Sequence, residues 1–509
     1  MNKKLILDFL EDTCKKFPNK TAFADPETSL TFSELVAQSK IIGSNLAEYV
    51  KTGSVIPFYL DKCTLAISGF MGAVYAGCAY APLNLRFPAA RIQKLLETIN
   101  SPIVITDKKH FEALKNITDL KIIILEDILS CQPNENILKQ RRAELVDIYP
   151  LYVSFTSGST GNPKGVVESH KNIVDFIKDF TECFNVNEND VFANQAPFDF
   201  DASVKDIYSG IFTGARVEII PTSYFIDPVK LMDFLCDREV TIMVWAVSAL
   251  CFLTTMNALQ YKTPDKVRGI LFSGEVMPVK HLKKLKKFLP DVMYVNLYGP
   301  TEITCNCTYY ILDRDFNDAE TIPIGKPFKN KKVFLLDENN NEVTEKGMTG
   351  ELCVSGSSVA LGYLNNFEKT QENFTQNPLN KSWHERIYRT GDIIKISENG
   401  EWIYVSRKDF QIKHMGHRIE LTEIDTAINS LPGIDRACCQ YIKEKGKIIA
   451  FVSGDFDRSN INSLLLKILP EYMLPNLYFQ VERMPLNKNG KIDRQALMDL
   501  YINRKEKSK

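Results

Sequence analysis

The segment LYVSFTSGSTGNPKGVVESHKNIVDF (151–176) is the feature that most constrains the fold of this chain. An apolar run of strand length leads into a loop dense in Thr, Ser and Gly with one lysine, Lys164, and a helical pattern begins near Ser169. Glycines let backbone N–H groups approach an anion, hydroxyls add donors, and the lysine adds a compact positive charge. The segment therefore predicts a phosphate-binding loop between a strand and a helix.

A Walker A loop is the sharpest alternative for such a segment. That loop requires Gly immediately before the lysine and Ser or Thr immediately after it. Here Pro163 and Gly165 flank Lys164. Two positions therefore contradict a P-loop NTPase, and a plain surface loop does not account for this density of Gly, Ser and Thr.

The rest of the chain predicts an α/β multidomain protein. Apolar runs such as SPIVITD, KIIILED and TIMVWAV alternate with helical patterns such as PVKLMDFLCDRE, which predicts parallel α/β layers. From about residue 321 short strands and turns dominate, and 509 residues are too many for one core. We expect a large N-terminal domain (1–406) of two α/β layered subdomains plus a small β-rich subdomain (321–406), followed by a small mobile α+β C-terminal domain (407–509).

Composition excludes several classes of partner. The 62 Lys and Arg residues nearly balance 63 Asp and Glu, so neither nucleic acid nor an anionic membrane is expected as a partner. The charged N-terminal segment lacks the apolar core of a signal peptide, and no stretch reaches about 18 apolar residues, so we expect a cytoplasmic protein. The 12 cysteines and 6 histidines show no zinc-ligand spacing, which favours reduced thiols over a metal site.

The loop FTSGSTGNPKG resembles the phosphate loop of the adenylate-forming superfamily, which includes acyl-CoA synthetases, luciferases and peptide-synthetase adenylation domains. AGCAYAPLNLRFPAARI (76–92) resembles an early motif of that family. Five further segments resemble later motifs of that family and occur in the family's order. They are NLYGPTE (296–302), GELCVSGSSVALGY (350–363), YRTGD (388–392), SRKDFQIKHMGHRIEL (406–421) and NKNGKIDRQAL (487–497). The resemblance covers nearly the whole chain and implies an ATP-dependent, AMP-forming ligase that uses Mg²⁺.

The resemblance also implies roles for individual residues in nucleotide binding. Asp392 would accept hydrogen bonds from both ribose hydroxyls, with Arg407 close by, since a carboxylate has two acceptor oxygens. Thr301 and Glu302 would lie near the α-phosphate, with Glu302 as a Mg²⁺ ligand. The ATP phosphates would be held by Thr156, Ser157, Gly158, Ser159, Thr160, Gly161 and Lys164, and the adenine site would comprise Asn296, Tyr298 and Gly299.

The last segments imply how the reaction is driven. Lys491 would contact the substrate carboxylate and the bridging region of ATP. Because a carboxylate is already a nucleophile, its attack on the α-phosphorus needs positioning and charge neutralisation more than a general base. Asp409 occupies the family's hinge position, and Lys413 lies in the segment that faces the site after the C-terminal domain rotates. Ser406 stands where the family usually has Gly, a departure that touches no reacting group.

The segment FDFDASVKDIYSGIF resembles the amino-acid-activating branch of the family, in which Asp201 would pair with the substrate α-ammonium. A buried carboxylate is costly without a cation, although an Asp here would also suit a helix cap. Lys205, one helical turn later, either reaches toward an acidic or polar substrate side chain, forms a helix ion pair with Asp201, or faces solvent. Motif alignment completes the pocket with Ala202, Val244, Leu271, Ser273, Leu297, Cys305 and Asn306.

The acceptor of the activated group is expected to be the phosphopantetheine thiol of a separate carrier protein, because the chain ends soon after NGKIDRQAL. FSGEVMP and KDFQIKHMGHRIEL resemble the D-alanine:D-alanyl carrier protein ligases, which are stand-alone enzymes. Ser273 and the WAVSA run depart from the Cys and the STPSF-like run usual there, so a small polar or acidic amino acid is an equal candidate. An acyl-CoA or aryl-CoA synthetase is the alternative enzyme, and a catalytically silent scaffold is the alternative outside enzymes.

Overall fold

The computed structural model describes residues 4–158, 163–408, 411–456, 460–486 and 492–506. Backbone contacts divide the chain into two units. The first consists of Met1–Leu85, Leu96–Phe155 and Gly165–Lys408. The second consists of Arg86–Leu95, Thr156–Lys164 and Asp409–Lys509.

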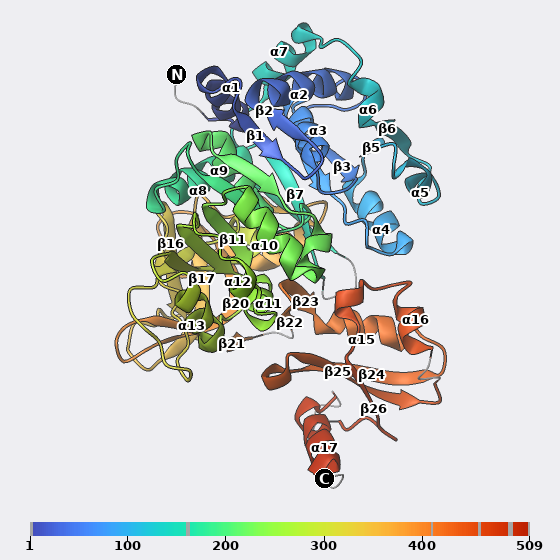
Figure 1. Cartoon of the computed structure of the whole chain (residues 1–509). Helices are drawn as coiled ribbons and strands as arrows, with labels where there is room; N and C mark the ends of the chain where they lie inside the picture. Colours follow the sequence, from blue (N-terminus) through green and yellow to red (C-terminus); the bar gives the residue numbers. More distant parts are fainter. Residues whose placement is uncertain (1–3, 159–162, 409–410, 457–459, 487–491, 507–509) are drawn as a thin grey trace. The chain divides into compact units, whose positions relative to one another are not determined.

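A nine-stranded mixed sheet forms one layer of the first unit (Figure 1). Its strand order is β15-β14-β13-β12-β11-β9-β10-β1-β2. Within the stretch from β13 to β1, each strand pairs with the next one in the parallel sense. The predicted parallel α/β layering is thus confirmed here. The strands are β1 (Thr21–Ala24), β2 (Ser29–Thr31), β9 (Val191–Asn194), β10 (Arg216–Ile219), β11 (Ile242–Ala246), β12 (Gly269–Ser273), β13 (Met293–Tyr298), β14 (Thr308–Ile311) and β15 (Lys326–Pro327).

A seven-stranded sheet forms the second layer of the first unit, in the order β18-β8-β7-β4-β3-β5-β6. Its central strands are parallel, and β18 adds to β8 in the antiparallel sense. Strands buried on both faces are expected to be continuous apolar runs, as the sequence of this region suggested. The strands are β3 (Val55–Tyr59), β4 (Ala79–Pro82), β5 (Ile103–Thr106), β6 (Lys121–Ile124), β7 (Pro150–Thr156), β8 (Lys164–Ser169) and β18 (Gly362–Tyr363).

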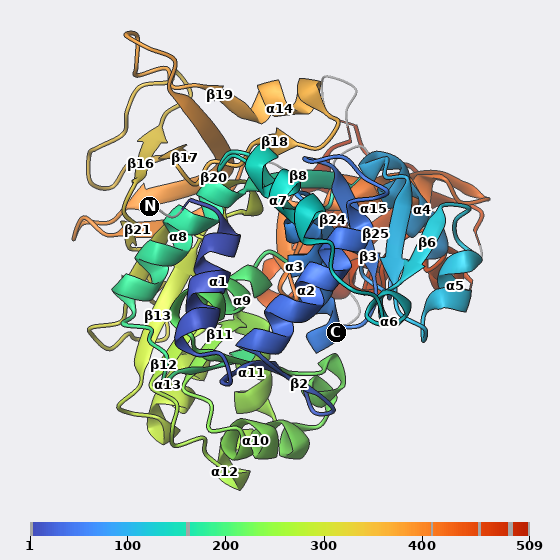
Figure 2. The same cartoon turned by 90° about the horizontal axis from the view of Figure 1, so that it is seen from above.

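One large apolar core joins the two sheets through five helices, and Figure 2 shows α8 beside α1. The helices α2 and α3 pack unusually closely because each has a glycine at the contact. A Cβ on Gly43 would lie 2.6 Å from Tyr75 Cβ, and a Cβ on Gly72 would lie 2.4 Å from Ile42 Cγ2. The five helices are α1 (Ile6–Lys16), α2 (Phe32–Leu46), α3 (Thr64–Tyr75), α8 (His170–Cys183) and α9 (Ser203–Thr213).

The other face of the nine-stranded sheet has its own core around Trp245. Along β11, Ile242 and Val244 belong to the core shared by the two sheets, whereas Met243 and Trp245 face the second core, as the alternation of a strand requires. The covering elements are η1 (Thr222–Ile226), α10 (Pro228–Asp237), α11 (Val247–Thr255), α12 (Ala258–Tyr261) and α13 (Val279–Phe288). The first unit also contains the helices α5 (Phe111–Lys115), α6 (Leu125–Ile128), α7 (Glu135–Glu144) and η2 (Thr301–Ile303).

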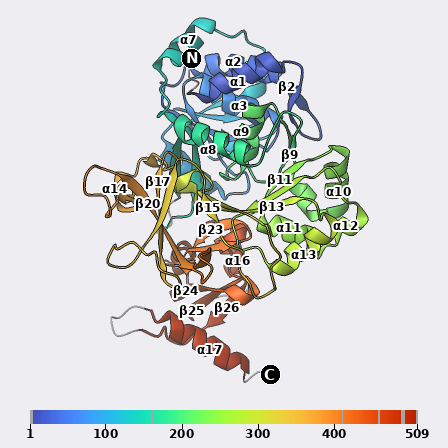
Figure 3. The same ribbon diagram turned by 90° about the vertical axis from the view of Figure 1, so that its left-hand side faces the viewer.

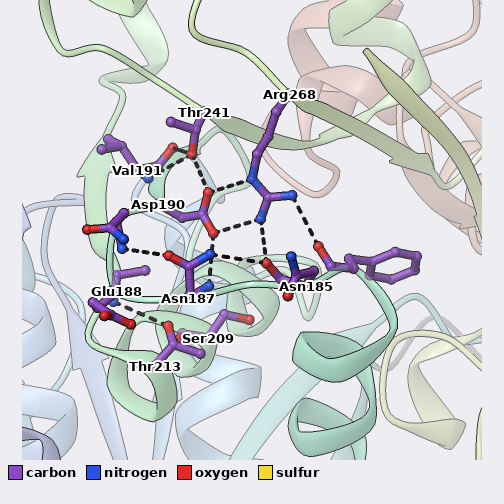
Figure 4. A network of polar contacts seen from close by, with 12 residues as sticks. Asn185, Asn187, Glu188, Asp190, Val191, Ser209, Thr213, Thr241 and Arg268 are labelled. Atoms are coloured by element: carbon purple, nitrogen blue, oxygen red, sulfur yellow. Dashed lines mark hydrogen bonds and ion pairs between the residues drawn. The ribbon is translucent and has the colours of Figure 1, made fainter. Parts of the chain in front are cut away.

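A polar network fastens the amino ends of three parallel strands (Figure 4). Asp190, Thr241 and Arg268 directly precede β9, β11 and β12, respectively. The Arg268 guanidinium donates to both oxygens of Asp190, at 2.7 Å each, and the Thr241 hydroxyl donates to Asp190 Oδ1 at 2.8 Å. A second bond from Arg268 to the Asn185 carbonyl, at 2.9 Å, ties the end of α8 to the same point. The network therefore stabilises the edge of the sheet opposite its carboxyl ends.

The β-rich region expected from about residue 321 is a five-stranded antiparallel sheet. Its order is β16-β17-β20-β19, with β21 paired to β20, and Figure 3 shows α14 beside it. The expected β-rich texture is therefore confirmed. The elements are β16 (Lys331–Leu336), β17 (Thr349–Gly356), α14 (Phe367–Asn373), β19 (Phe374–Gln376), β20 (Arg386–Ile396) and β21 (Trp402–Arg407).

The second unit mixes helix and strand. Met415 and Gly416 both have positive φ, 52° and 81°, and form the two-residue turn of the hairpin β22 (Gln411–His414) and β23 (His417–Glu420). A three-stranded sheet carries α15 on an apolar core, while Leu497 of α17 packs on another. These elements are α4 (Ala89–Ile99, which ends in the first unit), α15 (Leu421–Asn429), β24 (Ile434–Ile442), η3 (Lys443–Lys445), β25 (Lys447–Gly454), α16 (Ile461–Leu465), η4 (Glu471–Met473), β26 (Leu477–Gln480) and α17 (Arg494–Glu506).

The twelve cysteines are all free thiols, and Cys131 is the exposed one among them. Burial raises the pKa of most of the others, for example that of Cys63 to about 11 and that of Cys78 to about 12. Within the described ranges, no helix combines the length and the apolar composition that crossing a bilayer would require.

Candidate active site

Three predicted nucleotide-site residues form one buried cluster in the first unit. Asp392 of β20 stands opposite Arg407 of β21 in the register of the sheet, and Arg407 Nη1 donates to Asp392 Oδ1 at 2.7 Å. The hydroxyl of Tyr298, at the end of β13, donates to Asp392 Oδ2. Burial raises the pKa of Tyr298 well above its ordinary value, and the Asp392 carboxylate raises it further. The tyrosine therefore remains a neutral donor.

Two other predicted residues of the nucleotide site, Asn296 and Gly299, contact the backbone of neighbouring segments. Asn296 Nδ2 donates to the Pro323 carbonyl at 2.8 Å. Gly299 lies where the chain passes itself, since a Cβ there would be 2.5 Å from the Asn306 Cα and 2.6 Å from the Cys305 carbonyl oxygen. Only glycine fits that close approach.

Glu302 lies in η2, directly after the predicted adenine segment. Its side chain is 1% exposed, and the Tyr363 hydroxyl donates to Glu302 Oε1 at 2.8 Å. The two residues that follow η2, Thr304 and Cys305, have positive φ of 58° and 64°. Such a conformation is a genuine outlier for a β-branched threonine and concentrates at functional sites.

A second buried glutamate, Glu168 of β8, was not among the predicted residues. Thr304 Oγ1 lies 2.9 Å from Glu168 Oε2 and donates to the Ser358 carbonyl at 2.8 Å. Burial raises the pKa of Glu168 well above its ordinary value, and the nearby carboxyls of Asp201 and Glu302 raise it further. Three acidic groups thus share one region, which favours a bound cation.

Glu302 fits a magnesium ligand only together with groups that a bound nucleotide supplies. Within the described ranges, no group of three or more His, Cys, Asp or Glu side chains could hold a metal alone. Mg²⁺ is commonly held by one or two carboxylates together with substrate phosphates and water. Glu302, in its acidic surroundings, fits such a ligand when nucleotide phosphates supply the others.

Asp201 directly precedes the N-cap of α9, and it is not the cap. The cap position is Ala202, which makes no side-chain capping bond. Burial raises the pKa of Asp201, while Lys205 and a hydrogen bond from Thr301 oppose that rise. Cys305 Sγ donates to the Asp201 carbonyl oxygen at 3.2 Å. Three predicted site residues therefore meet around Asp201.

Lys205, Ser273 and Asn306 also converge, as residues of one pocket would. Lys205 is 1% exposed on α9, and its ammonium donates to Asn306 Oδ1 at 3.0 Å and to Ser273 Oγ at 3.4 Å. In the described part of the chain Lys205 makes no ion pair, so the alternative of an Asp201–Lys205 ion pair does not hold. The predicted apolar members, Val244, Leu271 and Leu297, are buried on β11, β12 and β13.

The described phosphate-loop residues belong to the second unit. Ser157 Oγ donates to the Arg418 carbonyl at 2.8 Å and accepts from the Glu420 N–H at 3.1 Å, and Lys164 Nζ lies 3.5 Å from Glu420 Oε1. Thr156 ends β7, Gly158 follows Ser157, and Lys413 lies on β22. Five predicted residues lie outside the described part of the chain: Ser159, Thr160, Gly161, Asp409 and Lys491.

Sequence reasoning missed Glu168, Thr304, Tyr363 and Lys331. Lys331 donates to the Asn306 carbonyl at 2.8 Å, with its ammonium over the rings of Phe176 and Phe328. Burial lowers the pKa of Lys331 to about 8. Each of these residues acts through a partner distant in the chain, so no local pattern marks it.

A sequence profile of the family described as AMP-binding enzyme matches residues 10–364. Tyrocidine synthase 3 of Brevibacillus parabrevis is 33% identical to this chain over 502 residues, which are 97% of this chain and 8% of that protein. Zwittermicin A synthase ZmaJ of Bacillus cereus is 31% identical over 505 residues, which are 97% of this chain and 94% of that protein. This chain thus spans a small part of the first relative and nearly all of the second.

Solved structures share the fold. The structure of holo-PA1221, an NRPS protein containing adenylation and PCP domains bound to a vinylsulfonamide inhibitor, matches with a TM-score of 0.82 at 23% identity, over 97% of this chain and 84% of that one. The crystal structure of IdnL1 matches with a TM-score of 0.82 at 24% identity, over 95% of this chain and 100% of that one.

Proposed function

The chain belongs to the AMP-binding enzyme family, and from that premise we propose that it activates an amino acid as its acyl-AMP and passes it to a carrier-protein thiol. Membership establishes the coarser statement: the protein is an ATP-dependent, AMP-forming ligase of the adenylation type found in nonribosomal peptide synthetases. The substrate, the acceptor and the residue roles below are parts of the proposal.

The reaction has two halves. In the first, a substrate carboxylate oxygen attacks the α-phosphorus of ATP, the bond from that phosphorus to the bridging oxygen breaks, and pyrophosphate leaves. In the second, a thiol loses its proton and attacks the acyl carbon, so that a thioester forms and AMP leaves. Both steps depend on bringing charged groups together, which positioning and electrostatic neutralisation achieve.

The cluster around Asp392 supports a ribose site. Each carboxylate oxygen can accept a second hydrogen bond in addition to those from Arg407 and Tyr298, so both ribose hydroxyls can be accommodated. The bonds from Arg407 and Tyr298, one to each oxygen, fix the orientation of the carboxylate. We assign the adenine to the segment that contains Asn296, Tyr298 and Gly299.

The phosphates and the metal complete the ATP site in this proposal. Mg²⁺ would supply charge neutralisation at the phosphate oxygens, held by Glu302 with Thr301 beside it. The loop residues from Thr156 to Gly161, with Lys164, would hold the phosphates through N–H groups, hydroxyls and one ammonium. Lys491 would offset the repulsion between the substrate carboxylate and ATP.

The acidic surroundings of Asp201 are the observation that carries the choice of an amino acid. Burial and the Glu302 charge oppose the ionisation of Asp201, which Lys205 favours, and the charges of Asp201 and Glu302 add to burial in raising the pKa of Glu168. A further cation in this region therefore stabilises the ionised carboxylates. An α-ammonium is the cation that an amino acid supplies, and fatty or aryl acids have none. D-alanine and a small polar or acidic amino acid are the candidates.

The acceptor in this proposal is the phosphopantetheine arm of a separate carrier protein. A relative matched along 94% of its own length supports a stand-alone enzyme, whereas other relatives contain the matching segment within far longer chains. We assign the hinge to Asp409, close to the junction of domains 1–406 and 407–509, and place Lys413 in the segment that serves thiol transfer. Twelve free thiols suit a cytoplasmic setting.

Amino-acid-dependent exchange of pyrophosphate into ATP tests the proposal, because it reports adenylation without a carrier. We expect exchange with one or a few amino acids when both enantiomers of the common ones are offered. Lys491→Ala and Asp201→Ala should each abolish it. Activity with a plain carboxylic acid and CoA, together with indifference to an amino group, would instead identify an acyl-CoA or aryl-CoA synthetase.

A further inference from the structure

The Lys205 ammonium is a buried cation whose partners are neutral. Its side chain is 1% exposed, and its hydrogen bonds go to the Asn306 amide oxygen and the Ser273 hydroxyl. An ammonium has three donors, so one remains after these two bonds. Removing such a charge from water costs several kcal/mol unless an anion lies nearby. The described residues supply no carboxylate in contact with it.

The two aspartates nearest in sequence do not supply that anion. Burial raises the pKa of Asp206 to about 7, and its Oδ2 is engaged by Asn194 Nδ2 at 2.7 Å. Asp201 interacts with Lys205 electrostatically without forming an ion pair, and it bonds to Thr301 instead. In the proposed function Asp201 is also reserved for the substrate α-ammonium.

Asn306 is held so that its amide is oriented toward the same place. Its carbonyl accepts from Lys331 at 2.8 Å, and its Oδ1 accepts from Lys205 at 3.0 Å. With the oxygen engaged, the Nδ2 group is the donor that Asn306 can offer to a ligand. Lys205 and Asn306 together therefore present an ammonium donor and an amide donor, a pair suited to a carboxylate.

We propose that the amino acid activated by this enzyme has an acidic side chain, whose carboxylate binds Lys205 and Asn306. This inference rests on the proposed amino-acid adenylation and narrows it. Asp201 directly precedes the N-cap of α9 and Lys205 lies in the first turn of that helix, so a negative and a positive group stand close enough to meet the two ends of one ligand. A substrate with an α-ammonium and a side-chain carboxylate complements both charges. D-alanine and neutral polar amino acids complement only the negative charge of Asp201.

The test compares pyrophosphate exchange by the full chain with aspartate and glutamate against their isosteres asparagine and glutamine, and against both enantiomers of alanine. We expect the preferred acid to exceed its amide by about 100-fold or more in kcat/KM, because an amide cannot neutralise the buried ammonium. Lys205→Met should remove that preference, chiefly by lowering kcat/KM for the acid. The comparison of two acids identifies the side-chain length.

A matched control is Lys62→Met, since Lys62 is a half-buried lysine whose ammonium donates to the backbone carbonyls of Asn194, Gln195 and Ile220. It should leave the acid-to-amide ratio unchanged. Asn306→Asp is a second variant that keeps the lysine. Its new carboxylate should pair with Lys205 and also abolish the preference for acids.

The outcomes separate this inference from the function on which it rests. Exchange with alanine or another neutral amino acid, with acids rejected, overturns the inference and keeps amino-acid adenylation. Equal losses for acid and amide in Lys205→Met also overturn it, since Lys205 would then serve a part common to all amino acids. Absence of exchange with every amino acid overturns both.

Discussion

The Arg407 guanidinium lies 2.7 Å from Asp392 Oδ1, with the Asp392 side chain 1% and the Arg407 side chain 7% exposed. Removing one member of such a buried pair typically costs about 3–5 kcal/mol. Asp392→Asn should therefore lower the unfolding free energy by several kcal/mol, measured by urea denaturation. It should also raise the KM for ATP about tenfold or more. Tyr298→Phe, which removes a single hydroxyl, should cost only about 1 kcal/mol; equal costs would contradict this account.

Asp190 should make folding stability depend on pH at the acid end. Burial raises the pKa of Asp190, but hydrogen bonds from Arg268, Asn187 and Thr241 outweigh it and hold the pKa below the ordinary 3.8. A lowered folded pKa stabilises the native state above the unfolded value, and this contribution is lost as pH falls through the folded value. Thermal unfolding from pH 6 downward should show a steeper loss below about pH 4 in the wild type than in Asp190→Asn. If the wild type and Asp190→Asn lost stability in parallel as pH falls, Asp190 would not be the source of the pH dependence.

Gly299→Ala should impair the site more than a glycine substitution in open space. The new methyl carbon would lie 2.5 Å from Asn306 Cα, a backbone atom of the segment between η2 and β14 that moves only if the chain there shifts. Gly400 offers the control, because nothing lies within 4 Å of a Cβ there and only its φ of +82° disfavours alanine. We expect exchange to fall at least about 100-fold for Gly299→Ala, and stability alone to fall by about 1 kcal/mol for Gly400→Ala.

Removal of divalent metal should stop the reaction and leave the fold unchanged. No cluster of metal-ligating side chains exists among the described residues, so the ion would arrive with the nucleotide. EDTA should abolish exchange, added Mg²⁺ should restore it, and the Tm without nucleotide should change by less than about 1 °C. A large fall in Tm would instead indicate a structural metal.

Thiol labelling of the native protein should give one fast-reacting cysteine. Cys131 is exposed, whereas burial raises the pKa of Cys251 to about 11 and that of Cys353 to about 12. Because the thiolate is the reactive species, an alkylating reagent at pH 8 should modify Cys131 within minutes. Intact-mass and peptide analysis would show it, and Cys131→Ser should remove the fast phase.

Sequence reasoning located the layers and much of the pocket because both depend on local signals. Alternating apolar runs predicted the parallel strands. Motif alignment predicted that Lys205, Ser273 and Asn306 share a pocket, and their side chains are in contact. Glu168 was missed because its meaning comes from Thr304, 136 residues away, and from the charges of Asp201 and Glu302. The helix-cap alternative for Asp201 failed because the helix begins one residue later than a cap there would require.

The contact between α2 and α3 has a consequence for how this sequence can vary. Gly43 meets Tyr75 on the other helix, and Gly72 meets Ile42, so neither glycine can gain even a methyl group unless the partner helix gives way. In a saturation library scored for abundance alone, with no activity assay, both positions should tolerate nothing but glycine. A smaller side chain at position 75 or 42 should not rescue either, because the nearest atoms include the Cβ atoms of Tyr75 and Ile42 and, for Gly43, the Gly72 carbonyl oxygen at 2.8 Å. Substitutions in α2 and α3 at this contact would therefore constrain one another.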